Sequence, residues 1–335
     1  MTTLTHSQKA TASKVDCSYH QKKFLPAGHA YRQAGRQVGA GVYIKGVGLL
    51  LGMIFGAGLF ALPYSMAKAG IIWGLMHFLI AFFLMLFLCY LYSEVTYYTP
   101  GRHRFTGYVK KLLGSRSELF ALVITLFSYY GTLLVYGVLG GIFLSNIFNT
   151  INSVTFSLLF FIIGGGLILL TLERVGMVNL YLTVPIFVFI VYLLFEALPL
   201  VELTNFSLFP VSGSLWFLPY GIWLFSLAGF AVIPEVKDIN TNIKTFKRII
   251  LISILLAALF YFMFIFTVVG VGGNDTSPDA LSGIASLIGR KAMVFGSLLG
   301  FLAVFTSFLA LAVDLKNIYR YDYGLPKIFA WLCAV

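Results

Sequence analysis

Acidic residues are scarce in this sequence of 335 residues, which contains 12 Asp and Glu and only 10% charged residues in all. A typical soluble domain is about 25% charged, so this composition argues against an ordinary water-soluble fold. So few carboxylates also leave little material for an acid-rich metal site. The three cysteines, Cys17, Cys89 and Cys333, are an odd number without close spacing, which argues against a disulfide scaffold and a zinc site.

The motifs of the common enzyme classes are missing as well. The sequence has no Gly-x-Ser-x-Gly nucleophile elbow, no His-Glu-x-x-His metal motif and no Gly-x-x-x-x-Gly-Lys phosphate loop. It has five histidines, three of which fall within residues 1–45. We therefore expect neither an enzymatic activity nor a cofactor.

Apolar residues, by contrast, are abundant, because 59% of the chain is hydrophobic and the mean hydropathy is +0.92. A helix needs about 20 apolar residues to cross a hydrocarbon core of about 30 Å. Eight runs of about this length predict eight transmembrane helices, at residues 46–68, 71–97, 118–149, 155–172, 176–199, 215–237, 248–271 and 292–316. We expect an all-α, multi-pass protein whose main partner is a lipid bilayer.

The net charge of +11 follows from the way that the basic residues are distributed. Residues 1–45 carry seven Lys or Arg against one acid and contain no long apolar run, which predicts a disordered basic arm. If this arm is cytoplasmic, all but three of the 23 Lys and Arg fall on the cytoplasmic side, the exceptions being Lys68, Arg290 and Lys291. The positive-inside rule therefore predicts a cytoplasmic N-terminus. We expect the protein to lie in the plasma membrane. No nucleic-acid partner is needed to explain the charge.

Two of the predicted spans are interrupted in the same way. Gly58 is followed five residues later by Pro63, and Gly229 is followed five residues later by Pro234. Glycine lowers helix propensity by about 1 kcal/mol and proline removes a donor, so both segments are expected to unwind locally. The two spans cross in opposite directions, which is typical of an inverted repeat with a binding site between its halves. For either segment alone, close helix packing at glycine is the alternative interpretation.

These residues resemble a known family. The run Gly52–Gly70 resembles the first span of the amino acid/auxin permease family and of the related bacterial aromatic amino-acid permeases. Phe225–Glu235 resembles their sixth span, and Tyr319–Trp331 resembles the loop before their ninth. Both groups belong to the amino-acid/polyamine/organocation superfamily. The resemblance implies a leucine-transporter-like 5+5 inverted repeat, with a first repeat at 46–199 and a second at 215–335.

The second repeat is expected to be incomplete. The spacing between Gly58 and Gly229 places the partner of the fifth span largely beyond residue 335, and Ile328–Val335 supplies only the start of a ninth span. We therefore expect a C-terminally truncated permease with eight full spans, and an inactive fragment is one alternative.

The resemblance implies a secondary active transporter of neutral or aromatic amino acids that works by alternating access. The N–H groups at the start of the helix after the first break would bind the substrate carboxylate, and carbonyls freed at the second break would bind its ammonium group. Two phenylalanines would close over the substrate, and the middle of the third span would line the pocket. The expected substrate site comprises Gly56, Ala57, Gly58, Tyr129, Tyr130, Phe225, Ser226, Ala228, Gly229 and Phe230. Ordinary packing is the alternative for the aromatic members.

A driving ion is expected in the eighth span. Thr306 and Ser307 lie three and four residues after Ala303, so two hydroxyls and a carbonyl share one helical face. Hard cations prefer such oxygen ligands. The arrangement resembles the sodium site of the superfamily, to which the carbonyls of Leu51 and Ile54 would add. We expect sodium at Thr306 and Ser307; proton coupling, and hydroxyls that merely bond to their own helix, are the alternatives.

Three acidic residues, Glu94, Glu235 and Asp314, lie near the cytoplasmic ends of predicted spans. Pairing with basic neighbours would latch an inner gate there, and simple solvated helix ends are the alternative. A non-transporting amino-acid-sensing receptor could use the same binding site, with only residues 1–45 left for signalling. The sequence does not indicate an oligomeric state.

Overall fold

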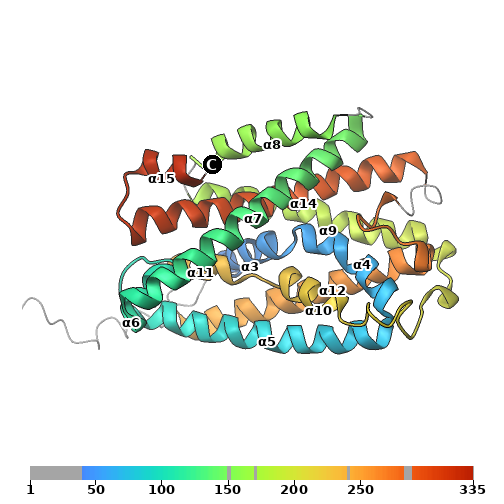
Figure 1. The fold of residues 1–335 in the computed structure, drawn as a ribbon, viewed down its shortest axis with the longest axis horizontal. Helices are drawn as coiled ribbons and strands as arrows, with labels where there is room; N and C mark the ends of the chain where they lie inside the picture. The colour runs from blue at the N-terminus through green and yellow to red at the C-terminus, as the bar shows by residue number, and fades with distance from the viewer. Residues whose placement is uncertain (1–39, 149–151, 170–171, 240–241, 283–288, 335) are drawn as a thin grey trace, which may run out of the picture. The chain divides into compact units, whose positions relative to one another are not determined.

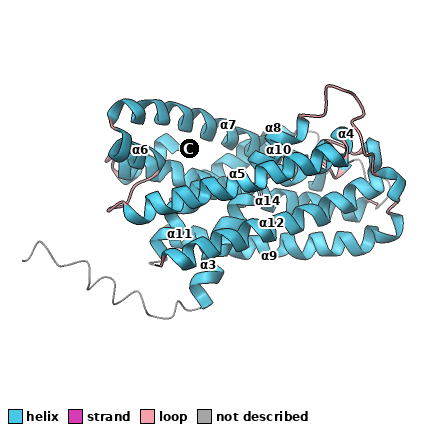
Figure 2. Ribbon diagram, turned by 90° about the horizontal axis from the view of Figure 1, so that it is seen from below, coloured by secondary structure: helices cyan, strands magenta, loops and turns pink. Residues whose placement is uncertain are grey.

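The computed structural model describes residues 40–148, 152–169, 172–239, 242–282 and 289–334, which form helices and connecting loops (Figures 1 and 2). These ranges contain no strand, which confirms the all-α prediction. Most of the predicted basic arm, residues 1–39, lies outside the described residues. Its last six positions, residues 40–45, form the beginning of the first described helix instead.

The first half of the chain contains α3 (Ala40–Ile54), α4 (Ala57–Ala69), α5 (Ile71–Tyr98), α6 (Phe105–Leu113), α7 (Ser115–Phe148), α8 (Ser153–Leu167) and α9 (Leu172–Ala197). A connection with the short 3₁₀ helices η1 (Leu198–Leu200) and η2 (Leu203–Asn205) leads to the second half. This half contains α10 (Leu218–Ser226), η3 (Phe230–Val232), α11 (Ile233–Ile239), α12 (Ile243–Gly272), η4 (Gly273–Asp275), α14 (Arg290–Asn317), the π-helical turn η5 (Ile318–Asp322) and α15 (Lys327–Ala334).

By length and apolarity, four single helical stretches can cross a membrane: Ile71–Tyr98, Ser115–Phe148, Ile243–Asp275 and Met293–Asp322. The pair α3 and α4, which is bent by 56° at its break, makes a fifth candidate. Of the remaining predicted spans, α8 has 15 residues, and the segment 215–237 is divided among α10, η3 and α11. The span predicted at 176–199 lies in the 26-residue α9 and η1, of which Val184–Leu200 qualifies as a shorter apolar helix. Eight full spans therefore stay a prediction.

Helix α5 shows why this arrangement suits lipid rather than water. Its exposed face is apolar and includes Phe83 and Phe87, whose side chains are 63% and 58% exposed. The buried face carries residues at intervals of three or four, most of them small or polar, namely Gly74, His77, Ala81, Met85, Cys89, Ser93 and Thr96. Small residues on the inner face let helices approach closely, which is the packing mode of helices in a bilayer.

The interrupted segments lie within the bundle formed by the long helices (Figure 1). α4 packs against α10, so the helix after the first interruption meets the helix before the second. α3 packs against α9, α12 and α14, and α7 packs against α14 and α8. Chain segments about 170 residues apart in sequence are thereby brought together, and the site described below lies between them.

Candidate functional site

The first interruption consists of Phe55 and Gly56, between α3 and α4. The Gly56 N–H donates to the Ile54 carbonyl at 2.9 Å, two residues back, so the helical pattern is lost here. A Cβ on Gly56 would lie 2.8 Å from Ser307 Oγ and 3.0 Å from the Tyr136 hydroxyl, so a larger residue does not fit. α4 starts at Ala57 without a side-chain cap. The Leu59 N–H donates to the Gly56 carbonyl at 3.2 Å, and the N–H groups of Ala57 and Gly58 before it lie at the positive end of the helix dipole.

The second interruption comprises Leu227–Gly229, between α10 and η3. The sequence predicts free carbonyls here, and the structure corrects this for three of the four between Phe225 and Ala228. The carbonyls of Phe225, Ser226 and Leu227 accept hydrogen bonds from the Ala228 N–H, the Tyr261 hydroxyl and the Gly229 N–H. The oxygens of Ser226 and Leu227 each keep a second lone pair, so an additional donor can still be accepted there, whereas the Phe225 oxygen also accepts from the Leu227 N–H.

Tyr261 of α12 connects the two interruptions. Its buried hydroxyl lies 2.6 Å from the Ile54 carbonyl and 2.8 Å from the Ser226 carbonyl, and its single proton serves either one. Gly58 brings the two segments together directly, because a Cβ at this position would lie only 2.2 Å from Ser226 Oγ and 2.8 Å from Ser226 Cα. The relative position of the two interruptions is therefore fixed by one hydroxyl and one glycine.

A cavity of about 290 Å³ lies against both interruptions. Its walls come from residues at or beside the first interruption (Met53, Ile54, Gly56, Gly58), at or beside the second (Phe225, Ala228, Phe230, Ala231), from α7 (Ser128, Tyr129, Thr132, Tyr136) and from α14 (Leu311). None of these lining residues is charged. The volume is at the lower end of the range of about 300–1,000 Å³ that is usual for small-molecule sites. The cavity therefore suits one small ligand with an apolar part.

Six of the ten residues predicted to bind substrate line this cavity, namely Gly56, Gly58, Tyr129, Phe225, Ala228 and Phe230. Ala57, Ser226 and Gly229 belong to the two interrupted segments but are not among its lining residues. The Ser226 hydroxyl instead donates to the Ile222 carbonyl of its own helix at 2.7 Å.

Tyr130 lies elsewhere. Its hydroxyl is 2.9 Å from the Tyr319 hydroxyl and also donates to the Cys333 carbonyl, on the side of α7 that faces α15. Neighbouring residues on a helix point about 100° apart, so Tyr129 and Tyr130 do not share a face. The structure therefore keeps Tyr129 at the cavity and removes Tyr130 from it.

Two residues of α7, Thr132 and Tyr136, were missed as site residues. Together with Ser128 they repeat a hydroxyl every fourth residue, which places all three on one helical face. That spacing is the sequence signal by which they could have been found. Tyr261 offered no such signal, because it is one of 19 tyrosines and its partners lie in distant segments.

The predicted ion site is also arranged differently from expectation. The Ser307 hydroxyl oxygen lies 3.1 Å, 3.2 Å and 3.0 Å from the carbonyl oxygens of Gly52, Met53 and Phe55. Thr306 is turned away from this cluster, since its hydroxyl donates to the Ala303 carbonyl at 2.8 Å. Thr306 therefore follows the alternative to an ion site, in which the hydroxyl bonds to a carbonyl of its own helix.

The carbonyls of Leu51 and Ile54, which the sequence suggested as ion ligands, are used in other ways. Leu51 accepts from the Phe55 N–H at 2.8 Å, and Ile54 accepts from both Gly56 and Tyr261. The carbonyls that contact Ser307 are those of Gly52, Met53 and Phe55, and the binding of an ion there stays a prediction. The Gly52 carbonyl is available because the Gly56 N–H, its partner in a regular helix, bonds to Ile54 instead.

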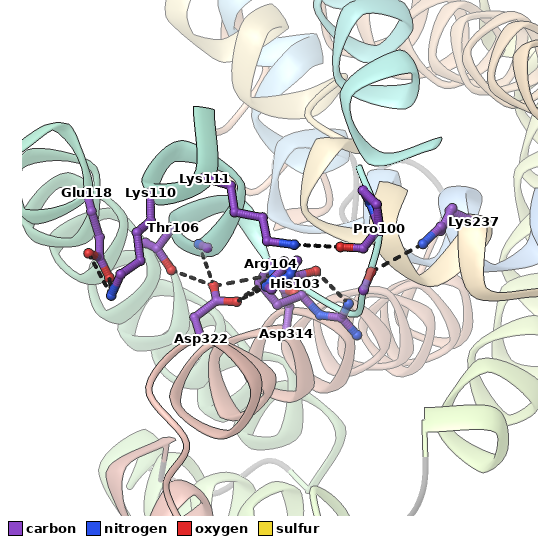
Figure 3. A network of polar contacts seen from close by, with 12 residues as sticks. Pro100, His103, Arg104, Thr106, Lys110, Lys111, Glu118, Lys237, Asp314 and Asp322 are labelled. Atoms are coloured by element: carbon purple, nitrogen blue, oxygen red, sulfur yellow. Dashed lines mark hydrogen bonds and ion pairs between the residues drawn. The ribbon is translucent and has the colours of Figure 1, made fainter. Parts of the chain in front are cut away.

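A buried ionic network lies at one end of the bundle, where α5 and α14 end and α7 begins; we call this the basic end (Figure 3). Arg104, in the loop between α5 and α6, is 1% exposed. Its Nη2 is 2.8 Å from Glu235 Oε1, and its Nε is 3.1 Å from Asp314 Oδ1. Burial acts to lower the pKa of Arg104, but the charges of Glu235 and Asp314 outweigh it and raise that pKa above its ordinary value. Tyr129, a wall of the cavity, donates to Asp314 Oδ2 at 2.8 Å.

A second carboxylate, Asp322 of η5, holds the loop that carries Arg104. It accepts from the Arg104 N–H at 3.0 Å, from Thr106 Oγ1 at 2.7 Å and from the Gly107 N–H at 2.7 Å (Figure 3). These donors form the N-terminal turn of α6, where a negative charge is favourable. Of the three acids that the sequence placed near cytoplasmic ends, Glu235 and Asp314 join the network, whereas Glu94 pairs with Lys247 at the surface.

Comparison with known proteins agrees with this architecture. A profile of the tryptophan/tyrosine permease family matches residues 41–325. The chain belongs to this family. The resemblance to aromatic amino-acid permeases is thereby confirmed. A comparison with curated protein sequences gives no significant match.

Two solved structures share the fold of this permease. Mhp1, a nucleobase-cation-symport-1 family transporter in a closed conformation with bromovinylhydantoin bound, has a TM-score of 0.69 at 13% identity; the match covers 87% of this chain and 69% of Mhp1. MhsT in complex with L-phenylalanine has a TM-score of 0.70 at 13% identity, and the match covers 89% of this chain and 77% of MhsT. Both are transporters with the leucine-transporter fold. The permease is therefore an integral, multi-pass membrane protein with that architecture.

Proposed function

We propose that this permease is a secondary active transporter of neutral amino acids with apolar or aromatic side chains, working by alternating access. The observation that carries the proposal is the cavity of about 290 Å³ that lies between two interrupted helices and is lined by no charged residue. Interrupted helices expose peptide groups where a bilayer offers no other partner, so they are usually placed against a binding site.

The substrate is bound at both of its charged ends by backbone groups. Its carboxylate lies at the start of α4, next to Gly56 and Gly58, where the helix dipole is positive. Its ammonium group lies at the carbonyls of the second interruption, beside Ala228. The side chain packs against Phe225 and Phe230, which are 39% and 38% exposed and can close over it. MhsT, whose structure contains L-phenylalanine, has the same fold and supports an aromatic substrate.

The driving ion in this proposal is a cation held at Ser307. One hydroxyl donates to one carbonyl at a time, so at least two of the three carbonyls at Gly52, Met53 and Phe55 receive no donor from it. Neutral oxygens gathered in this way fit sodium, which would supply positive charge next to the first interruption. A proton is the second candidate, because Tyr129 connects the cavity to the buried carboxylate of Asp314.

The basic end faces the cytoplasm in this proposal, and the membrane is the plasma membrane. Arg104, Lys110, Lys111, Lys247 and Lys316 all lie on segments at this end. Loops rich in Lys and Arg stay on the cytoplasmic side. Since α3 begins at the same end, the N-terminus is cytoplasmic.

Counterflow in proteoliposomes tests the proposal. Purified protein is reconstituted into vesicles loaded with unlabelled L-tryptophan, and the entry of radiolabelled L-tryptophan is measured with Phe, Tyr, Leu, Lys and Glu as competitors. We expect entry that Phe and Tyr inhibit and that Lys and Glu do not. Binding without counterflow would favour the amino-acid-sensing receptor, and the absence of both would contradict the proposed function. Replacing sodium by N-methylglucamine then decides between the two ions.

A further inference from the structure

The network at the basic end has more negative than positive groups. Glu235 and Asp314 are each 2% exposed, and Arg104 is the only ion-pair partner of either carboxylate among the described residues. Two ionised carboxylates would leave one buried negative charge without a counterion. An uncompensated charge inside a membrane protein is strongly unfavourable and generally marks a functional group.

Within the part of the chain that the structure describes, the surroundings of the pair do not supply a second cation. The charged or titratable groups that face it come from α5 (Tyr92), the loop before α6 (Arg104), α7 (Tyr129) and α11 (Asp238), with Asp322 in η5; Tyr108 of α6 faces Arg104. His103 lies 3.7 Å from Asp322 rather than next to the pair. The charge of Asp322 is already met by the N-terminal turn of α6. The surplus negative charge therefore belongs to Glu235 and Asp314.

One oxygen of the pair lies outside the ion pair with Arg104. Glu235 Oε2 is buried, and the donors near this carboxylate other than Arg104 are uncharged, namely its own N–H and the side chain of Asn317. A carboxylate oxygen with only neutral donors beside it is better placed to carry a proton than one that is paired with a cation. A proton on this oxygen would remove the surplus charge and would give the site a donor.

Tyr129 links this pair to the cavity. Its ring lines the cavity, and its hydroxyl donates to Asp314 Oδ2 at 2.8 Å. The hydroxyl can pass its proton to Asp314 and take another from water in the cavity, so a proton reaches the pair from the cavity side without passing through lipid. No other atom is exchanged in this step.

We propose that Glu235 and Asp314, sharing Arg104, form a proton-binding site that is filled from the cavity and that controls opening of the basic end. Arg104 joins α11, through Glu235, to α14, through Asp314. A proton on either carboxylate removes the charge from one arm of this bridge, so α11 is released from α14 while the guanidinium keeps one partner. The inference rests on the proposed function, since it requires a cavity that water and substrate enter.

Proton entry and tryptophan counterflow, measured on the same proteoliposomes, test this site. A pH-sensitive dye inside vesicles with the same sodium concentration on both sides, so that sodium supplies no driving force, reports proton entry when L-tryptophan is added outside. Under a pH difference of about one unit, acid outside, one proton per substrate supports about tenfold accumulation of radiolabelled tryptophan. We expect Asp314→Asn and Glu235→Gln to abolish tryptophan-dependent proton entry and this accumulation, and to retain counterflow, which needs no net proton movement.

Glu94→Gln is the matched control, because Glu94 forms a partly exposed pair with Lys247 outside the network; proton entry should be unchanged in this variant. Proton entry that persists in both network variants would overturn the inference. Counterflow in the wild-type protein without any tryptophan-dependent proton entry would overturn it too, even if neither variant folds, and would leave the proposed function intact. A wild-type protein without counterflow would refute both.

Discussion

The two interruptions have similar sequences but different surroundings. Around the first, a Cβ on Gly56 or Gly58 would collide with atoms of Ser307, Tyr136 and Ser226 at 3.0 Å or less. Around the second, a Cβ on Gly229 would meet only the side-chain ends of Ile54 and Leu50, at 3.2 Å and beyond. The first interruption is therefore clamped by polar and backbone atoms, whereas the second rests on flexible apolar side chains.

This difference assigns different tasks to the two segments. The clamped segment presents the start of α4 in a fixed place, which suits the recognition of a carboxylate. The second segment carries Phe225 and Phe230, both exposed at the cavity, and its apolar contacts can rearrange without breaking hydrogen bonds. We infer that the first interruption is the fixed wall of the site and that the second is the part that moves.

Replacement of Gly58 is expected to have the largest effect. In Gly58→Ala the new Cβ would lie 2.8 Å from the backbone of Ser226, so α4 and α10 must separate. Overpacking of this kind costs about 1–3 kcal/mol and would displace both walls of the cavity. We expect tryptophan binding, measured by scintillation proximity, to weaken by at least about tenfold. Gly221→Ala in α10, where no atom lies within 4 Å, is the control, and equal losses in the two variants would contradict the clamp.

The next effect concerns the hydroxyl that joins the two interruptions. Tyr261→Phe leaves the buried carbonyls of Ile54 and Ser226 without this donor. A lost buried hydrogen bond costs about 1–2 kcal/mol, and somewhat less in a membrane protein. We expect a lower melting temperature in detergent and weaker tryptophan binding. Tyr181→Phe removes a hydroxyl from a side chain that is 73% exposed and should change neither; a wild-type melting curve for Tyr261→Phe would argue against the link.

The sequence predicts some of these features and not others for physical reasons. Gly58, Pro63, Gly229 and Pro234 act on their own backbone, so the places where helices end can be predicted from local chemistry. The register of carbonyls at Ser307 could not be predicted, because it depends on how the peptide at Phe55 turns after the helix ends.

Contacts between distant segments could not be predicted either. Arg104 pairs with Glu235 and Asp314, more than 130 residues away, and the loop that carries it contains no motif. Pairing with basic residues was expected for all three acids and is found for all three, but the pair of Glu94 with Lys247 is partly exposed, whereas Glu235 and Asp314 are buried. Burial decides between such candidates, and it follows from helix packing rather than from local residue pattern.

The third prediction tests whether the first interruption also holds the ion. Ser307→Ala removes the only side-chain oxygen that contacts Gly52, Met53 and Phe55 among the described hydrogen bonds. A ligand of this type contributes about 1 kcal/mol, so the sodium concentration for half-maximal tryptophan uptake should rise about fivefold. Thr306→Ala is the matched control, because that hydroxyl bonds to Ala303 and should matter less. A larger effect at Thr306 than at Ser307 would reverse the assignment.

The smallest effect is expected at the second interruption, and it decides whether the comparison holds. In Gly229→Ala the Cβ would touch Ile54 and Leu50 at 3.2 Å, and side-chain ends of this kind can move by the few tenths of an ångström that are needed. The backbone adds no strain, since φ at Gly229 is −96°. We therefore expect tryptophan binding within about twofold of the wild type, which corresponds to less than about 0.5 kcal/mol. Alanine favours helix over glycine by about 1 kcal/mol, so any loss should appear in the rate of counterflow rather than in binding. A binding defect as large as that of Gly58→Ala would show that both segments are clamped alike, and the distinction between a fixed wall and a moving one would fail.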